Sequence, residues 1–311
     1  MKRKAHYPAL VLHGGAWDIP DDLVEAHFVG IKKALQIGWK ILKNGGSSVD
    51  AVEETIKSLE DNPTFDAGKG SFLNALGEIE LDASIMHGET LRAGAVAAVK
   101  NIRNPISLAR IIMDKSEHIL LVGIGAIRFA KEHGITQCTM EDLLVGRELQ
   151  RWLDLQKEPL SSTKDVFHSR KKIRMPSGTV GVVALDCSRN ICAGTSTGGT
   201  PNKYPGRVGD SPLIGCGTYA DNNIGGVSTT GWGEAMIKVV MAKTIIDIME
   251  HNNGNGTIAT EKGIALLQKK AGGYGGAIAL NKNGEVGIAF NTPRMARGYI
   301  TIGMKTPIIE V

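Results

Sequence analysis

The chain has 311 residues, of which 42% are hydrophobic and 22% charged, and its formal net charge is +4. These proportions are ordinary for a globular protein, and so small a net charge argues against a nucleic-acid partner. No apolar stretch reaches the ~20 residues of a membrane-spanning helix. The apolar run 9–12 is too short for a signal peptide, and the four cysteines lack metal-ligand spacing. We expect a cytoplasmic protein without a membrane partner.

The first half of the chain predicts strands and helices in separate blocks. Apolar residues recur every three or four positions after Asp21, and again after Ser48, which predicts two helices ending near Asn44 and Pro63. Ser48 is the predicted N-cap of the second helix. The other predicted elements are strands at 9–12, 79–85 and 95–99 and a helix that begins at Asn104-Pro105.

The stretch from about residue 140 to residue 178 differs from its surroundings. It is charged, contains serines and loses periodicity after Leu155, which predicts a mobile linker with one short helix. Beyond it the pattern changes to short strands, predicted at 180–185, 191–197, 213–217, 226–230, 275–280 and 285–290, with helices at 234–249 and 261–270. Because strands and helices do not strictly alternate, the pattern disfavours a Rossmann-type sheet and favours stacked sheets with helices outside, an α+β class.

Four segments of the second half carry a family resemblance. They are PSGTVGVVALD at 176–186, GTSTGG at 194–199, PGRVGDSP at 205–212 and TTGWGE at 229–234. Together they resemble the plant-type L-asparaginase / isoaspartyl peptidase branch of the N-terminal-nucleophile hydrolases, and the resemblance covers nearly the whole chain. It implies a four-layer αββα sandwich that cuts itself between Gly178 and Thr179. The products would be an alpha subunit, 1–178, and a beta subunit, 179–311, assembled as a homodimer of αβ units.

An N-terminal threonine explains how such a chain works without a Ser-His-Asp set. A threonine hydroxyl needs a nearby base to act as a nucleophile. The α-amino group that appears on Thr179 after cleavage has a pKa of roughly 7.7–8.0 in peptides, which suits a general base at neutral pH. Gly178 aids the cut because it has no Cβ to block attack on its carbonyl. Taken alone, the segment Gly178-Thr179-Val180-Gly181 is more typical of the start of a plain strand.

Further threonines would complete the catalytic machinery. Hydrolysis of an amide places negative charge on the carbonyl oxygen, and each donor aimed at it contributes roughly 2.7–4 kcal/mol. The resemblance assigns this oxyanion hole to Thr230 and the backbone N–H of Gly231, and it makes Thr197 the residue that tunes the nucleophile. Thr195 and Thr229 are interpreted as ordinary β-branched strand residues.

Arg207 and Asp210 are the candidate residues for substrate recognition. A guanidinium offers a planar fork to a carboxylate, and a carboxylate accepts bonds from an ammonium, so the pair suits a free amino-acid head group. The resemblance assigns Arg207 to the substrate α-carboxylate and Asp210 to its α-amino group, with Thr230, Gly231 and Gly233 lining the same pocket. Taken alone, the two residues also fit a surface ion pair on a turn.

Two features of the first half complete the resemblance. The loop 59–69 resembles the family's sodium loop, whose ligands here would be the backbone carbonyls of Leu59, Glu60, Asn62, Phe65, Ala67 and Lys69; no other cofactor is implied. His13-Gly14-Gly15 resembles the family's opening strand-to-loop element near the catalytic centre. His13 itself is as well explained as an ordinary packed histidine.

The sequence therefore predicts an autocatalytically cleaved amidohydrolase that converts L-asparagine to L-aspartate and ammonia and cleaves β-aspartyl dipeptides. A glycosylasparaginase, acting on the glycan–asparagine bond, is the nearest alternative enzyme, but Gly198-Gly199 fits the asparaginase branch better. A threonine-type endopeptidase fits less well, because Asp210 favours a free amino-acid head group. The non-enzymatic alternative is a binding protein that never cuts itself.

Overall fold

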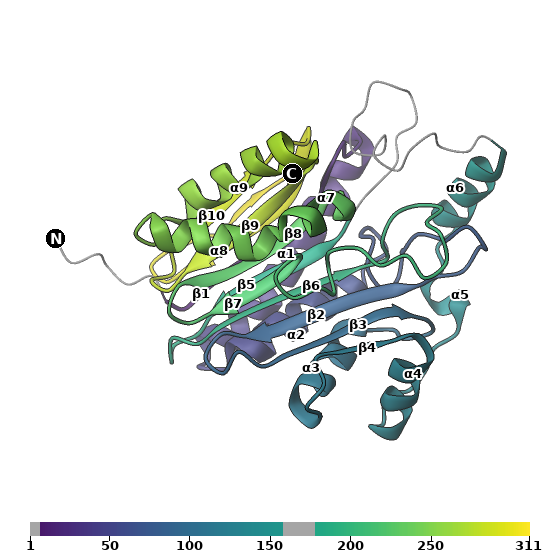
Figure 1. Ribbon diagram of the computed structural model, residues 1–311, viewed down its shortest axis with the longest axis horizontal. Helices are drawn as coiled ribbons and strands as arrows, with labels where there is room; N and C mark the ends of the chain where they lie inside the picture. The colour runs from purple at the N-terminus through teal and green to yellow at the C-terminus, as the bar shows by residue number, and fades with distance from the viewer. Residues whose placement is uncertain (1–6, 158–177) are drawn as a thin grey trace.

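The computed structural model describes residues 7–157 and 178–311 and has four layers (Figure 1). Two β-sheets face each other at the centre, and helices cover the outer face of each sheet. The predicted four-layer α+β arrangement is confirmed at this level. The predicted cut of the chain is taken up under the proposed function, and predictions about residues 158–177 lie outside the described residues.

The larger sheet interleaves strands from both halves of the chain. Its order is β12-β11-β1-β5-β6-β2-β3-β4, and neighbouring strands are antiparallel except β3 and β4. Four strands precede residue 178: β1 (Ala9–Trp17), β2 (Leu81–His87), β3 (Ala93–Val99) and β4 (Leu120–Val122). Four follow it: β5 (Val180–Leu185), β6 (Ile191–Thr197), β11 (Arg294–Thr301) and β12 (Ile308–Glu310).

The smaller sheet is antiparallel throughout and has the order β10-β9-β8-β7. Its strands are β7 (Thr218–Asp221), β8 (Gly225–Gly231), β9 (Gly275–Asn281) and β10 (Val286–Phe290). Val11 and Val183 from the large sheet pack with Ile278 and Leu280 from the small one. This apolar layer fixes the spacing between the sheets, and β8 of the small sheet contacts both β5 and β6 of the large one.

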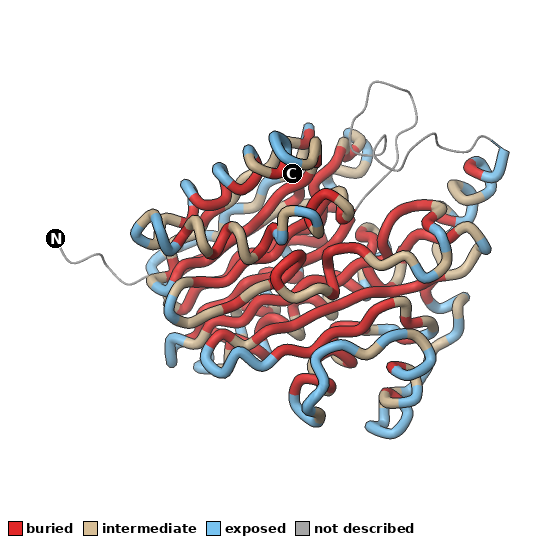
Figure 2. The backbone as a smooth tube through the Cα atoms, in the orientation of Figure 1, coloured by how far each residue is buried: buried red, intermediate tan, exposed pale blue. Residues whose placement is uncertain are grey.

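The helices divide between the two outer faces. The large sheet packs against α1 (Asp21–Lys43), α2 (Ser48–Glu60), α3 (Pro105–Lys115) and α4 (Gly123–Glu132), and the small sheet against α7 (Gly233–Val239), α8 (Met241–His251) and α9 (Gly256–Ala271). Figure 2 shows the resulting pattern, with buried strands inside and exposed helix surfaces outside. Within the described ranges, no helix is both long and apolar enough to cross a membrane.

Several predicted boundaries need correction. The first strand continues through His13-Gly14-Gly15 as far as Trp17, with an irregular register after His13. The N-cap of α2 is Ser47, whose side chain accepts the N–H of Asp50, and Ser48 is the first helical residue. Only an isolated bridge forms at Ile214, because that segment turns before the strand proper begins in β7.

The predicted long helix 234–249 is two helices. Val240 adopts a left-handed conformation (φ 47°) that ends α7 and starts α8. The predicted linker is partly ordered as α5 (Met140–Leu143) and α6 (Gly146–Lys157), so its first half was wrong. Buried Glu148 pairs with Arg147 and Arg151 within α6, and the indole N–H of Trp152 attaches the helix to the Asn74 carbonyl oxygen over 2.9 Å. The predicted linker beyond residue 157 lies outside the described residues.

Candidate active site

Thr179 stands at the start of β5, beside the end of β6. Because Val180 pairs with Ser196, the preceding Thr179 lies opposite Thr197 on the neighbouring strand. Both threonines are buried, and their hydroxyl oxygens are 3.0 Å apart. The N–H of Gly199 donates to the Thr197 hydroxyl oxygen over 3.0 Å. If Thr197 in turn donates to Thr179, its O–H can stabilise negative charge on the Thr179 oxygen.

The bond before Thr179 is held by Asp66, a residue that the sequence did not single out. The N–H of Asp66 donates to the carbonyl oxygen of Gly178 over 3.2 Å, and the carbonyl oxygen of Asp66 accepts the N–H of Gly198 over 3.0 Å. Its carboxylate accepts the N–H of Phe72. Burial raises the pKa of the Asp66 carboxyl to about 8. Asp66 thus links the Gly178–Thr179 bond to the turn beyond β6.

His13 contacts Thr179 directly. Its Nδ1 lies 3.0 Å from the carbonyl oxygen of Thr179, and its Nε2 lies 2.9 Å from the hydroxyl oxygen of Ser228. A carbonyl can only accept, so Nδ1 carries the proton and Nε2 accepts from Ser228. Burial lowers the pKa of His13 to about 3, against the opposing effect of the Thr179 bond. His13 is therefore neutral at pH 7, where it fixes the backbone of Thr179.

The hydroxyl of Ser228 continues into a buried network. It lies 2.7 Å from the hydroxyl oxygen of Thr195, which lies 2.6 Å from that of Thr218. Thr195 is therefore more than the plain strand residue that the sequence indicated: it connects the two sheets through hydrogen bonds behind His13.

Thr230 offers a buried hydroxyl on the same face of β8 as Ser228, because side chains two residues apart share a face. Within the described part of the chain, its oxygen has no hydrogen-bond partner. An unsatisfied buried hydroxyl costs about 1–3 kcal/mol. Such a cost is consistent with a group that is satisfied by a ligand.

The neighbouring hydrogen bonds give the direction of the Gly231 backbone N–H. Trp232 N–H donates to Tyr274, the residue before β9, whereas Thr229 N–H donates to Gly217 on the other side of β8. Successive N–H groups of an antiparallel strand alternate in direction, so that of Gly231 points away from β9. Its φ of 143° favours glycine, and an added Cβ would come within 2.4 Å of the Tyr274 carbonyl oxygen.

Arg207 and Asp210 lie against Gly233, at the start of α7. A Cβ on Gly233 would come within 2.9 Å of an Asp210 carboxylate oxygen and 3.0 Å of the Arg207 Nη2. Arg207 forms a bidentate ion pair with Glu234, both N–O distances being 2.9 Å. The predicted pair is thus present in one place, but the ion-pair partner of Arg207 is Glu234.

Asp210 is almost fully buried and is held by Thr229, whose hydroxyl donates to it over 2.9 Å. Burial raises the pKa of Asp210 to about 6, and the Thr229 bond opposes that rise. Asp210 is therefore ionised at neutral pH. Thr229, which the sequence suggested was an ordinary strand residue, positions this carboxylate.

The loop predicted to hold sodium follows the C-terminal end of α2. The carbonyl oxygens of Leu59, Glu60 and Asn62 accept backbone N–H groups of the same loop, and each retains a second lone pair. A helix C-terminus concentrates negative potential, and neutral carbonyl oxygens suit a hard cation. The donor set is therefore compatible with sodium. In the described ranges, no group of three or more His, Cys, Asp or Glu residues could hold a metal ion.

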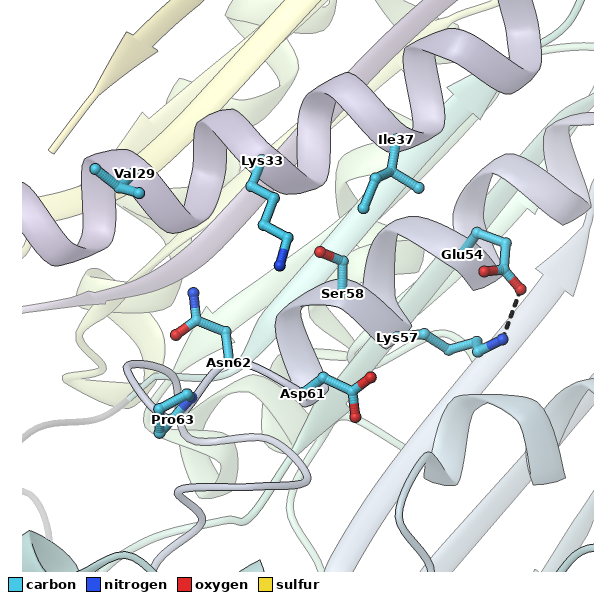
Figure 3. A pocket seen from close by; sticks show the side chains of 9 residues that line it. All are labelled: Val29, Lys33, Ile37, Glu54, Lys57, Ser58, Asp61, Asn62 and Pro63. Atoms are coloured by element: carbon cyan, nitrogen blue, oxygen red, sulfur yellow. Dashed lines mark hydrogen bonds and ion pairs between the residues drawn. The ribbon is translucent and has the colours of Figure 1, made fainter.

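A separate surface cavity of about 600 Å³ lies between α1 and α2 (Figure 3). Lys33 and Ile37 line it from α1, and Lys57, paired with Glu54 over 2.7 Å, lines it from α2. None of the candidate catalytic threonines lines this cavity. We assign it no part in the chemistry at Thr179.

Comparison with known proteins identifies the family. A model of the asparaginase family matches residues 6–308. The chain belongs to this family. The isoaspartyl peptidase/L-asparaginase of Xenopus laevis is 44% identical over 289 residues, 93% of this chain and 91% of that protein. The protein of the same name from Bos taurus is 46% identical with the same coverage, and that from Homo sapiens is 44% identical over 281 residues, 89% and 88% of the two chains. The family predicted from sequence is confirmed.

In this asparaginase-family chain, sequence reasoning missed Asp66 and Glu234 and left His13 open. Each makes its contact with a residue distant in sequence, and nothing in the local sequence marks Asp66 or His13. A signal was present for Glu234, which follows Gly233 directly and carries the charge opposite to that of Arg207.

Proposed function

We propose that this chain is a threonine amidohydrolase that hydrolyses L-asparagine and β-aspartyl dipeptides after cutting itself between Gly178 and Thr179. The observation that carries the proposal is the buried Thr179–Thr197 hydroxyl pair in a chain of the asparaginase family. The relatives named isoaspartyl peptidase/L-asparaginase, 44–46% identical over most of their lengths, support the two substrates.

Self-cleavage begins with attack of the Thr179 hydroxyl oxygen on the Gly178 carbonyl carbon. The C–O bond forms, the C–N bond breaks, and the hydroxyl proton reaches the departing amine, which leaves an ester. The N–H of Asp66 already bonds the Gly178 oxygen, so it can stabilise the charge that develops there. Water then hydrolyses the ester and leaves Thr179 with a free amine.

Turnover reuses that oxygen with the new amine as base. The amine takes the hydroxyl proton while the oxygen attacks the side-chain amide carbon of the substrate. Thr230 and the N–H of Gly231 stabilise the oxyanion, and Thr197 donates to the nucleophile. Ammonia, or the amine of the released residue, leaves with the proton, and water hydrolyses the acyl-enzyme to L-aspartate.

The substrate head group is recognised by charge. Arg207 binds the α-carboxylate and Asp210 the α-ammonium, while Gly233 lets both approach. Because both side chains are largely buried, their bonds to substrate are stronger than those of exposed groups.

The remaining proposals concern assembly. Residues 1–178 and 179–311 form the alpha and beta subunits of one unit, and two such units form a homodimer in the cytoplasm. A sodium ion, held by the carbonyls of loop 59–69, would stabilise the loop that carries Asp66.

The test is intact-mass analysis of the purified protein, followed by assays of ammonia release from L-asparagine and of leucine release from β-aspartyl-leucine. Two fragments, one beginning at Thr179, together with both activities are expected. A full-length chain after long incubation would support the binding protein, and activity on glycosyl-asparagine alone would support the glycosylasparaginase.

A further inference from the structure

The ion pair between Arg207 and Glu234 has a defined geometry. Glu234 accepts from the Nε and the Nη2 of Arg207, each over 2.9 Å. The Arg207 side chain is 15% exposed and that of Glu234 is 39% exposed. Burial alone would raise the pKa of Glu234, but the bonds and charge of Arg207 more than offset this and lower it. Both groups are therefore charged at neutral pH.

This contact uses only one edge of the guanidinium. Arginine has five N–H donors, one on Nε and two on each Nη. With Glu234 on the Nε–Nη2 edge, both hydrogens of Nη1 and the second hydrogen of Nη2 remain. The Nη1–Nη2 edge can therefore bind a second carboxylate with two parallel hydrogen bonds.

Two glycines border that remaining edge. A Cβ on Gly209 would lie 2.9 Å from Nη1, and one on Gly233 would lie 3.0 Å from Nη2. Both distances are too short for an ordinary side-chain contact, so any larger residue would crowd the guanidinium. The absence of side chains at 209 and 233 preserves access to the end of Arg207.

Glu234 is also connected to the oxyanion donors. It lies four residues after Thr230, in a segment whose backbone is fixed where Trp232 N–H donates to Tyr274 over 2.9 Å. Lys238, one helical turn further, interacts with the Glu234 charge and offsets part of it. Because Glu234 follows Thr230 and Gly231 closely in the chain, its ion pair fixes the position of Arg207 relative to these two residues.

We propose that Glu234 is a positioning residue for substrate recognition, which binds the Nε–Nη2 edge of Arg207 and so presents the Nη1–Nη2 edge to the α-carboxylate of the substrate. This inference rests on the proposed function and extends it: Glu234 selects substrates with a free α-carboxylate. In its absence, the Arg207 side chain samples several rotamers, and the carboxylate binds at an entropic cost.

The experiment compares Glu234→Ala with wild type on two substrates, L-asparagine and its α-amide, L-asparaginamide. For L-asparagine, the KM should rise by up to roughly tenfold, because the substrate carboxylate must then order the Arg207 side chain as it binds, while kcat stays within about threefold. For L-asparaginamide, which has no α-carboxylate, the KM should change by less than about twofold. Glu250→Ala, an exposed glutamate on α8, is the matched control, and both variants should still cut themselves.

A double-mutant cycle separates positioning from general support. In the Arg207→Lys variant there is no planar guanidinium for Glu234 to orient. Adding Glu234→Ala to this variant should therefore not raise the KM for L-asparagine further. Glu234→Gln, which keeps an acceptor for one of the two bonds, should recover part of the wild-type KM.

Three results would overturn the inference. An equal rise in KM for both substrates would show that Glu234 only supports the fold of α7. A fall in the KM for L-asparagine would show that Glu234 competes with substrate for Arg207. No change in either KM, in an enzyme that cuts itself and turns over normally, would reject the role of Glu234 alone. Wild-type protein that neither cuts itself nor hydrolyses asparagine would instead reject the proposed function.

Discussion

The two ends of the candidate site use different chemistry. At the nucleophile end, Thr179, Thr197 and Thr230 offer neutral hydroxyls, and the neighbouring His13 is kept neutral by burial. At the head-group end, Arg207 and Asp210 carry charges: burial opposes ionisation of both groups, but it also strengthens the electrostatic interactions that their charges make. In the proposed reaction, bond breaking would therefore depend on the placement of hydroxyl groups, whereas substrate recognition would depend on ionised side chains. Variants at the two ends should fail in different ways.

The largest effect is expected at the nucleophile itself. Thr179→Ala should remain one chain, and its hydrolysis of L-asparagine should fall by at least roughly 10⁴-fold, because both the attacking oxygen and its base are lost. Intact mass and ammonia release measure the two losses. Thr179→Ser keeps the hydroxyl and is the control, since it should still cut itself. Two fragments from the alanine variant would contradict the assignment of the cut.

A smaller loss is expected at the oxyanion donor. Thr230→Ala should lower kcat for L-asparagine by roughly 10²–10³-fold, with little change in KM, because the hydroxyl acts on charge that develops during the reaction. Steady-state kinetics of the self-cleaved variant measure this loss, and Thr230→Ser should restore most of the rate. Equal losses in the alanine and serine variants would show that the methyl group matters and that the hydroxyl does not.

The head-group end should respond to pH. Asp210 has a pKa raised to about 6, so it loses its charge as the pH falls through that value. The KM for L-asparagine should then rise by about tenfold for each pH unit below the pKa. Kinetics from about pH 5 to about pH 8 test this, with Asp210→Asn as a variant whose KM is high throughout. A flat KM for wild type would remove Asp210 from ammonium binding.

The smallest effect sharpens the same comparison. Thr229 donates to Asp210 and so favours its charged form. Thr229→Val should shift the midpoint of the KM profile upward by up to about one pH unit and leave kcat at neutral pH nearly unchanged. Thr229→Ser should restore the midpoint. A changed kcat with an unshifted profile would assign Thr229 to the nucleophile end instead.

The sequence predicted well those elements that are determined by the local pattern of residues, and it predicted poorly those that depend on contacts between distant segments. Helices such as α1 and α2 follow directly from apolar periodicity and were confirmed, as were β5 and β6. The break at Val240 was missed because helical periodicity continues across it. β11 was missed because glycine and arginine interrupt its apolar pattern. In the structure it pairs with β1, from the start of the chain, and with β12, from its end.

The candidate site shows the same division. Arg207, Asp210 and Gly233 carry recognisable local motifs, and the structure places them together. Asp66 meets Gly178 through a backbone bond across more than a hundred residues, so its residue type gives no warning of the contact. The hydroxyl network behind His13 likewise depends on which strands face each other, and that is fixed by tertiary packing.

The interleaving of the large sheet has a consequence for the molecule's history. β1 lies between β11 and β5, and β2 lies against β6, so strands from the two sides of residue 178 are hydrogen-bonded neighbours at three places in the sheet. If the backbone is cut there as proposed, neither fragment could leave without breaking the hydrogen bonds between these strands. Unfolding would then release two separate molecules, and their reunion would depend on concentration where the original folding did not. The uncut chain would thus fold into this structure more readily than the two separated fragments could reassemble into it.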